Sequence, residues 1–265
     1  MANAQKLAEI GTDQWGLVTA AQARRVGVTP QVMARMAKTG SLVRLAHGVY
    51  RLAGSPIDMH EDLRVTWLTL EPGMTAEERL TNEGVDIVSH RSAARLLDLG
   101  DVDADVMEFT VPRRKQTRRT DVRLHRSSIS TDDWALVAGL PTAKPHRVIA
   151  DLAAIRIDRG HLATVVRDAV LKHDLAVSTA AAILAPHAWG YGAMTGDGQG
   201  LVTLLLREAG IPRNTVDIVA RDAAMTIDLV EAVRRALAAD PTEAVRHAIQ
   251  NLTPPGPPST RSDDG

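Results

Sequence analysis

Two short helices in close succession are predicted by the segment Thr19-Ala-Ala-Gln-Ala-Arg-Arg-Val-Gly-Val-Thr-Pro-Gln-Val-Met-Ala-Arg-Met-Ala-Lys-Thr-Gly40. Thr19 and Gln22 have the spacing of a capping box, in which each side chain binds the other residue's backbone amide, so a helix is expected to begin at Ala20. Gly27 suits the left-handed position that follows a helix end. A second helix begins soon after it, which is the pattern of a helix-turn-helix motif.

The second helix is predicted over residues 30–39, because Thr29 suits its N-cap, Pro30 its first turn and Gly40 its end. Apolar side chains share one side of this helix. The opposite side carries Gln31, Ala34, Arg35 and Lys38. Gln pairs with adenine edges, Arg with guanine and Lys with guanine or phosphate, while a small Ala permits close approach to the groove. We therefore predict a reading helix, with a plain solvated polar face as the alternative.

Residues 41–52 read as two short strands joined at 46–48, where Gly48 permits a positive φ. A hairpin at this place is typical of the wing of a winged helix-turn-helix. We expect Arg44, His47 and Arg51 to contact DNA, with a simple turn residue as the alternative for His47. Two cations of the first helix, Arg24 and Arg25, complete the predicted DNA contacts.

Charge is segregated along the chain, although 31 Lys and Arg nearly balance 32 Asp and Glu overall. The net charge is +5 over residues 1–54, −9 over 55–112, +4 over 113–135 and −1 over the remainder. A basic end beside an acidic middle indicates two units with different partners. A Gly-Ser-Pro cluster at 54–56 marks the expected boundary between a DNA-binding domain (1–54) and a larger domain (55–252). The Pro-rich end, 253–265, is expected to be disordered.

The larger domain is predicted to be α+β, with helices near 63–70 and 89–99 and strands over 107–112 and 121–126 that form a hairpin. Further helices are expected after Gly139 and near 161–173, 178–185, 200–209, 227–239 and 242–251. The connection between the two strands carries five cations, namely Arg113, Arg114, Lys115, Arg118 and Arg119. These side chains are candidates for binding DNA phosphate or an acidic protein face, and a solvated mobile loop is the alternative.

Several kinds of chemistry are disfavoured by the sequence. The chain contains no Cys, which excludes disulfides, thiolate catalysis, Cys-zinc sites and iron–sulfur clusters. No Asp or Glu stands two residues before a Lys, as many nuclease sites require, and the His residues form no H-E-x-x-H motif. We expect neither catalytic residues nor a metal or other cofactor. With four Trp, two Tyr and one Phe, a platform that stacks single-stranded bases is also disfavoured.

No signal peptide and no run of 18 apolar residues is found, so a cytoplasmic protein without a membrane partner is expected.

The runs at 15–30 and 42–52 resemble the N-terminal domain of AbiEi-family antitoxins of type IV toxin–antitoxin systems, in particular the Gly-Leu-Val-Thr opening and the Gly-Val-Tyr wing. Residues 139–152 are similar to the C-terminal region of that family. Arg147, Asp151 and Leu152 match its pattern there, whereas Lys144 replaces the usual Thr. We interpret Arg147 and Asp151, one helical turn apart, as structural.

This resemblance implies a double-stranded DNA operator upstream of the protein's own operon and activity against a nucleotidyltransferase toxin, which such antitoxins generally counteract without a stable complex. A homo-oligomer on DNA is also expected. The alternative is a winged-helix transcription factor whose larger domain senses a ligand or assembles the oligomer.

Overall fold

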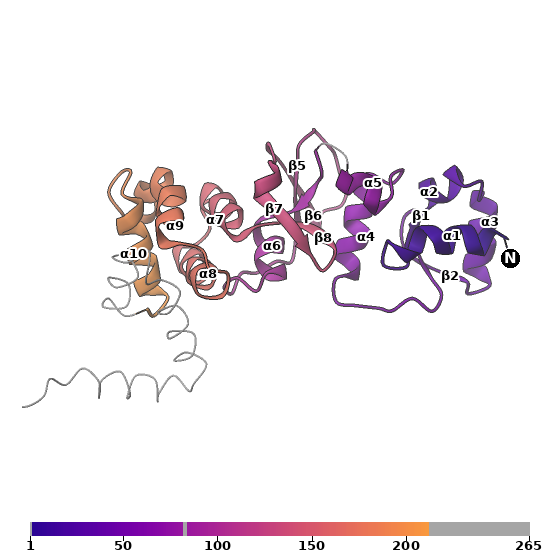
Figure 1. Cartoon of the computed structure of the whole chain (residues 1–265), viewed down its shortest axis with the longest axis horizontal. Helices are drawn as coiled ribbons and strands as arrows, with labels where there is room; N and C mark the ends of the chain where they lie inside the picture. Colours follow the sequence, from indigo (N-terminus) through magenta and orange to yellow (C-terminus); the bar gives the residue numbers. More distant parts are fainter. Residues whose placement is uncertain (1, 82–83, 212–265) are drawn as a thin grey trace, which may run out of the picture.

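The computed structural model describes residues 2–81 and 84–211, and the predicted helices at 227–239 and 242–251 and the tail at 253–265 lie outside them. The described part is elongated, with the N-terminal elements at one end and α10 at the other (Figure 1). The mixture of helices and sheets is the α+β class predicted from the sequence.

Residues 2–54 form three helices and a small antiparallel sheet with strand order β1-β3-β2. Its elements are α1 (Ala2–Thr12), β1 (Leu17–Thr19), α2 (Ala20–Arg25), α3 (Pro30–Lys38), β2 (Leu42–Ala46) and β3 (Val49–Leu52).

The capping signals of the sequence are confirmed. The Thr19 hydroxyl accepts a hydrogen bond from the Gln22 amide at 3.1 Å, and the Gln22 side chain accepts one from the Thr19 amide at 2.9 Å. Gly27 follows α2 with φ +80°, and Gly48 has φ +73° in the wing turn. The second helix ends at Lys38, with Thr39 as its C-cap.

Helix α1 and strand β1 were not predicted. Helix α1 buries only Leu7 and Gly11, so its apolar periodicity is weak. Leu7 nevertheless belongs to the small core of this unit, which also contains Val18, Ala23, Val28, Met33 and Leu42.

Residues 55–211 contain a five-stranded sheet with strand order β6-β5-β4-β8-β7. Its strands are β4 (Ile87–Val88), β5 (Met107–Val111), β6 (Val122–Arg126), β7 (Trp134–Val137) and β8 (Leu140–Ala143). The helices are α4 (Glu61–Leu70), α5 (Ala76–Thr81), α6 (His90–Leu96), α7 (Pro145–Ala154), α8 (Arg159–Lys172), α9 (Val177–Leu184) and α10 (Gly198–Glu208), and the 3-10 helices are η1 (Thr131–Asp133) and η2 (Ala185–Tyr191).

The predicted hairpin of 107–112 and 121–126 is wrong, because β5 and β6 pair in parallel, from Met107 opposite Val122 to Val111 opposite Arg126. Alternating apolar residues indicate strands but carry no information about their direction. A tight hairpin needs only two to five connecting residues, whereas the segment 112–121 is long enough to return along a five-residue strand.

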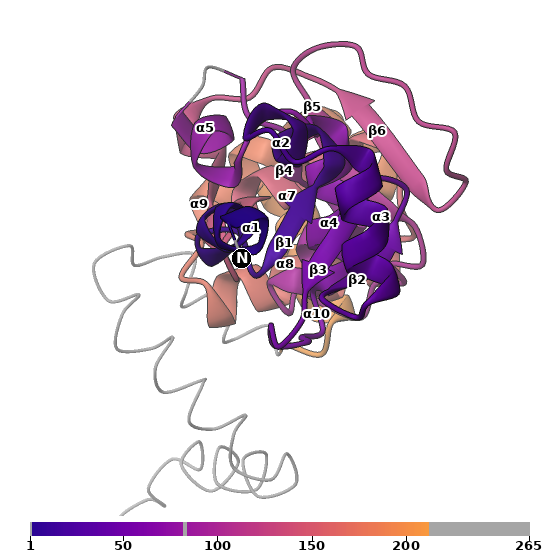
Figure 2. The ribbon, with the colours of Figure 1, turned by 90° about the vertical axis from the view of Figure 1, so that its right-hand side faces the viewer.

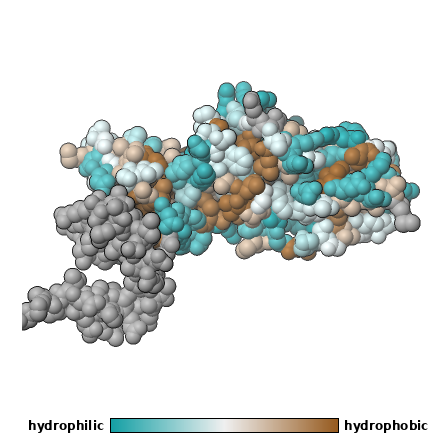
Figure 3. Space-filling model, viewed as in Figure 1, coloured by the Kyte–Doolittle hydropathy of each residue, from teal (hydrophilic) through white to brown (hydrophobic). Residues whose placement is uncertain are grey.

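The main core lies between the sheet and the helices, and its largest fully buried side chains include Trp67 and Phe109. Helix α6 packs against β5 and α7, and α10 packs against α8 and α9. Strand β7 forms one edge of the sheet and leaves Leu136 56% exposed. A hydrophobic patch in Figure 3 lies over this middle part of the molecule, where β7 and β8 appear in Figure 1. No helix among the described residues is long and apolar enough to cross a membrane.

Candidate nucleic-acid interface

Helix α3 presents the side chains predicted for base reading. Met33 is 1% exposed in the small core, and Val32, Met36 and Ala37 pack against that core. The opposite side is exposed and consists of Gln31, Ala34, Arg35 and Lys38. Because the two sides separate in this way, the polar stripe is free to approach a groove.

Residues 55–211, which we call the body of the protein, do not cover α3. The helix packs against α2 and β2, and it lies at the end of the molecule farthest from α10 (Figure 1). Seen from that end, α3 stands at the front (Figure 2). A duplex can therefore reach this helix without displacing residues 55–211.

The wing places two more polar side chains beside α3. Arg44 of β2 and His47 of the turn are both exposed, and β2 packs against α3. The Arg44 Nε lies 3.4 Å from the Ala46 carbonyl oxygen. The exposed side chains of the wing thus belong to a strand and turn that adjoin α3.

Four of the predicted contacts keep an uncompensated positive charge. Within residues 2–81 and 84–211, no ion pair involves Arg24, Arg35, Lys38 or Arg44. A DNA phosphate would meet these cations without first breaking an internal salt bridge.

Unlike these four cations, Arg25 and Arg51 each form an ion pair with the body. The Arg25 guanidinium binds both carboxylate oxygens of Glu78, at 2.6 and 2.7 Å, and the Gly73 carbonyl at 2.6 Å. This bidentate hydrogen bonding lowers the pKa of Glu78 to about 2. Arg51, whose side chain is 12% exposed, binds Glu61 at 2.5 Å. Both residues remain predictions as DNA contacts, and their positions give each of them a role in holding the winged helix to the body.

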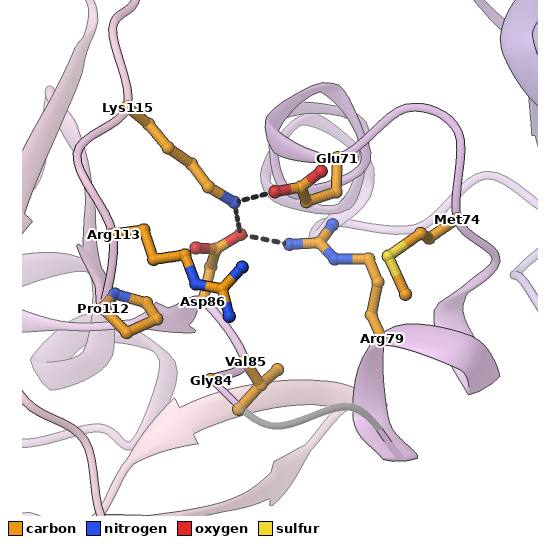
Figure 4. Close-up of a pocket in the computed structure, with 9 residues that line it drawn as sticks. All are labelled: Glu71, Met74, Arg79, Gly84, Val85, Asp86, Pro112, Arg113 and Lys115. Carbon is orange, nitrogen blue, oxygen red and sulfur yellow. Dashed lines mark hydrogen bonds and ion pairs between the residues drawn. The ribbon is translucent and has the colours of Figure 1, made fainter.

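Two of the five cations in the connection between β5 and β6 also form ion pairs within the protein, as Figure 4 shows for Lys115. Lys115 lies 2.6 Å from Asp86 and 2.7 Å from Glu71. Arg119 binds Asp121 and the Thr66 hydroxyl. The cations of this connection that stay exposed are Arg113, Arg114 and Arg118.

The winged helix is joined to the body by buried polar groups that the sequence did not reveal. The Thr19 hydroxyl donates to the Pro72 carbonyl, and the Gln22 side chain donates to the Met74 carbonyl at 2.7 Å. The Gln14 side-chain oxygen accepts from the Ala76 amide at 2.9 Å. The residues that cap α2 thus also bind the segment 72–76.

A second contact is aromatic and centres on Trp15. Its ring meets Trp67 edge-on, with centroids 6.1 Å apart, and the Arg64 guanidinium lies 5.0 Å from its centroid. A Cβ on Gly139 would come within 2.6 Å of the Trp15 indole nitrogen, so the tip of the β7–β8 hairpin touches the same ring. A single Trp before a strand gives no sequence signal for this role, because the residues that Trp15 contacts are distant in the sequence.

The Arg147–Asp151 pair predicted to be structural is formed, with 2.8 Å between Nε and Oδ1. Burial raises the pKa of Asp151. Nearby, the buried His90 ring stacks on His125 with 3.5 Å between centroids, and burial lowers the pKa of His90 to about 3. No group of three or more His, Asp or Glu side chains among the described residues is arranged to hold a metal ion.

Two helices joined by a tight turn and followed by a two-stranded wing define the class of winged helix-turn-helix domains. Residues 5–53 match the family described as "Transcriptional regulator, AbiEi antitoxin". The match extends from α1 to the end of the wing and confirms the resemblance predicted for the N-terminal segment. No curated protein matches this chain.

Proposed function

We propose that the protein is a DNA-binding antitoxin that represses its own operon and counteracts a nucleotidyltransferase toxin. The observation that carries the DNA-binding part is the exposed stripe Gln31-Ala34-Arg35-Lys38 on a helix that the body leaves uncovered. Arg44 and His47 of the wing extend the stripe. The family match of residues 5–53 supports the regulatory and antitoxin parts of the proposal.

In this proposal α3 enters the major groove and the wing approaches the backbone beside it. Gln31 and Arg35 contact base edges, and Lys38, Arg44 and Arg24 contact base edges or phosphates. A homo-oligomer would place two such helices on a repeated site.

The test measures binding of the full chain to a duplex from upstream of its operon, by fluorescence anisotropy at several salt concentrations. Arg35→Ala should lower discrimination between this duplex and an unrelated one by about 1–3 kcal/mol. Arg207→Ala is the matched control, because Arg207 is an exposed Arg on α10, at the far end of the molecule. Unchanged binding by Arg35→Ala, Gln31→Ala and Lys38→Ala together would contradict the choice of this surface.

Growth measurements test the antitoxin part. Expression of the toxin gene next to this one should arrest growth, and co-expression of this protein should restore it. A toxic neighbour that this protein does not neutralise would favour the alternative, a transcription factor whose larger domain senses a ligand or assembles the oligomer.

A further inference from the structure

The two sheets of the described residues have four edge strands, and three of these are protected from pairing with another chain. Strand β1 is buried, with α1 and α4 packed against it. Strand β2 carries the exposed Arg44, and β6 carries the exposed Arg123 and Arg126. Burial and charged side chains are common means by which proteins protect their sheet edges. Strand β7 lacks both, because Trp134-Ala-Leu-Val137 contains no charged residue and is open to solvent.

The exposure of β7 extends to both faces of the sheet at this edge. Leu136 is 56% exposed, and its neighbour Ala135 is exposed as well. Successive side chains of a strand point to opposite faces, so neither face is covered here. The hydrophobic patch of Figure 3 lies over the same part of the molecule. Figure 1 shows β7 midway between α3 and α10, so a chain bound at this edge leaves the reading helix free.

The register of β7 with β8 determines which backbone groups face outward. In an antiparallel pair, hydrogen-bonded and non-hydrogen-bonded residue pairs alternate. The Lys144 amide donates to the Asp133 carbonyl at 2.8 Å, which makes that pair a hydrogen-bonded one. Leu136 lies opposite Pro141, which has no amide to donate. The N–H and C=O groups of Trp134 and Leu136 therefore point away from β8, where no strand of the described residues pairs with them.

We propose that β7 pairs antiparallel with β7 of a second copy of this chain, about a twofold axis at Ala135. In this register Leu136 of each copy lies opposite Trp134 of the other. Both pairs are hydrogen-bonded, so the outward N–H and C=O groups of the two strands satisfy each other. The exposed Leu136 then contacts Trp134 of the second copy, a side chain that is partly buried against the main core.

A second copy fits this edge because the strand is complementary to itself. The same short strand supplies the donors, the acceptors, the exposed Leu136 and the Trp134 that covers it, as a twofold interface requires. Ala135 lies on the axis, where opposite Cα atoms are only about 4.5 Å apart and a small side chain is suitable. The dimer provides the homo-oligomer of the proposed function, and in that respect the inference rests on that function.

Disulfide formation tests the register, because the chain contains no Cys of its own. Ala135→Cys in the full chain should form an intermolecular disulfide on mild oxidation, since Cα atoms about 4.5 Å apart are within the range of a disulfide. Val137→Cys is the matched control on the same face of β7. Its two copies lie about 14 Å apart in this register, which is too far for a disulfide. Non-reducing electrophoresis without DNA measures both, and equal crosslinking, or none for Ala135→Cys, would overturn the proposal.

Sedimentation velocity of the unchanged chain without DNA should show a monomer–dimer equilibrium that depends on protein concentration. Leu136→Lys should raise the dissociation constant at least about a hundredfold, because each dimer loses the burial of two Leu side chains. Leu136→Pro should have the same direction of effect. It removes an amide that the fold does not use, and Pro is tolerated at such an edge position.

Val43→Lys is the control for these variants, because Val43 is 41% exposed on β2, an edge of the other sheet. It should dimerise as the unchanged chain does. A monomer at every concentration, or equal weakening by Leu136→Lys and Val43→Lys, would overturn the β7 interface. Because these measurements contain no DNA, their outcome is separate from that of the operator-binding test.

Discussion

Gln14 and Gln22 hydrogen-bond to each other twice through their side-chain amides, at 2.9 and 3.0 Å, at the place where the winged helix meets the body. Both residues are 1% exposed. Each has a further bond across the boundary, from Gln22 to the Met74 carbonyl and from the Ala76 amide to Gln14. Because the pair is buried and its members bind each other as well as the segment 74–76, the orientation of the winged helix relative to the rest of the protein depends on both residues together.

Gln22→Leu should destabilise the protein by roughly 1–3 kcal/mol, because it removes the buried hydrogen bonds that the Gln22 side chain makes with Gln14, the Met74 carbonyl and the Thr19 amide. The Gln14→Leu/Gln22→Leu double variant should lose less than the sum of the two single changes, since these residues bind each other. Chemical denaturation measures all three. Gln31→Leu, an exposed Gln of α3, should leave stability unchanged, and strict additivity of the two buried sites would contradict the coupling.

Gly198→Ala should destabilise the packing of α10 on α9 by about 1–3 kcal/mol or more, because a Cβ at this position overlaps the backbone carbonyl of Ala181. Backbone atoms of a packed helix have little room to move. Gly73→Ala is the control, since nothing lies within 4 Å of its added Cβ. Thermal unfolding should separate the two variants, and equal melting temperatures would contradict the close approach of α9 and α10.

Stability should fall below pH 6.5 because of His90. Its pKa is about 3 in the folded protein and near 6.5 when unfolded, so the unfolded chain binds more protons between these values. The contribution of His90 is fully present above pH 6.5 and decreases by at most about 1.4 kcal/mol per pH unit as the pH falls. Burial raises the pKa of Asp151, so the contribution of Asp151 to stability increases as the pH falls and opposes the loss caused by His90.

Denaturation curves between pH 7 and 5 measure this slope. His90→Asn should flatten it, and Asn also tolerates the left-handed backbone of this position, where φ is +51°. His47→Asn, in the exposed wing, should leave the slope as it is. A slope that survives His90→Asn would assign the pH dependence to other groups.

The parts of the fold that the sequence predicted are those with local signals. Thr19 and Gln22 are three residues apart, and the polar stripe of α3 spans two turns, so capping and periodicity sufficed for both. The parallel pairing of β5 and β6 depends on where the 112–121 segment runs, and alternation does not encode that. Lys115 was predicted as a phosphate or partner contact because it stands in a basic run. Its binding to Asp86, 29 residues earlier, depends on tertiary structure alone.

Arg24 and Arg25 are neighbours in α2 and were predicted alike, but their surroundings differ, and this gives a sharp test of the DNA surface. Arg24 is exposed and has no ion pair with a described residue, whereas Arg25 is held by Glu78 and the Gly73 carbonyl. The plot of log affinity against log salt concentration has a negative slope. If Arg24 binds a phosphate, Arg24→Ala should make that slope less steep by about 0.9. Arg25→Ala should leave that slope nearly unchanged, because its charge is already compensated by Glu78. Anisotropy titrations of the full chain over a range of salt concentrations measure both slopes. Equal losses for the two variants would mean that the Arg25–Glu78 pair opens on DNA, and a loss for Arg25→Ala alone would reverse the assignment of the two residues.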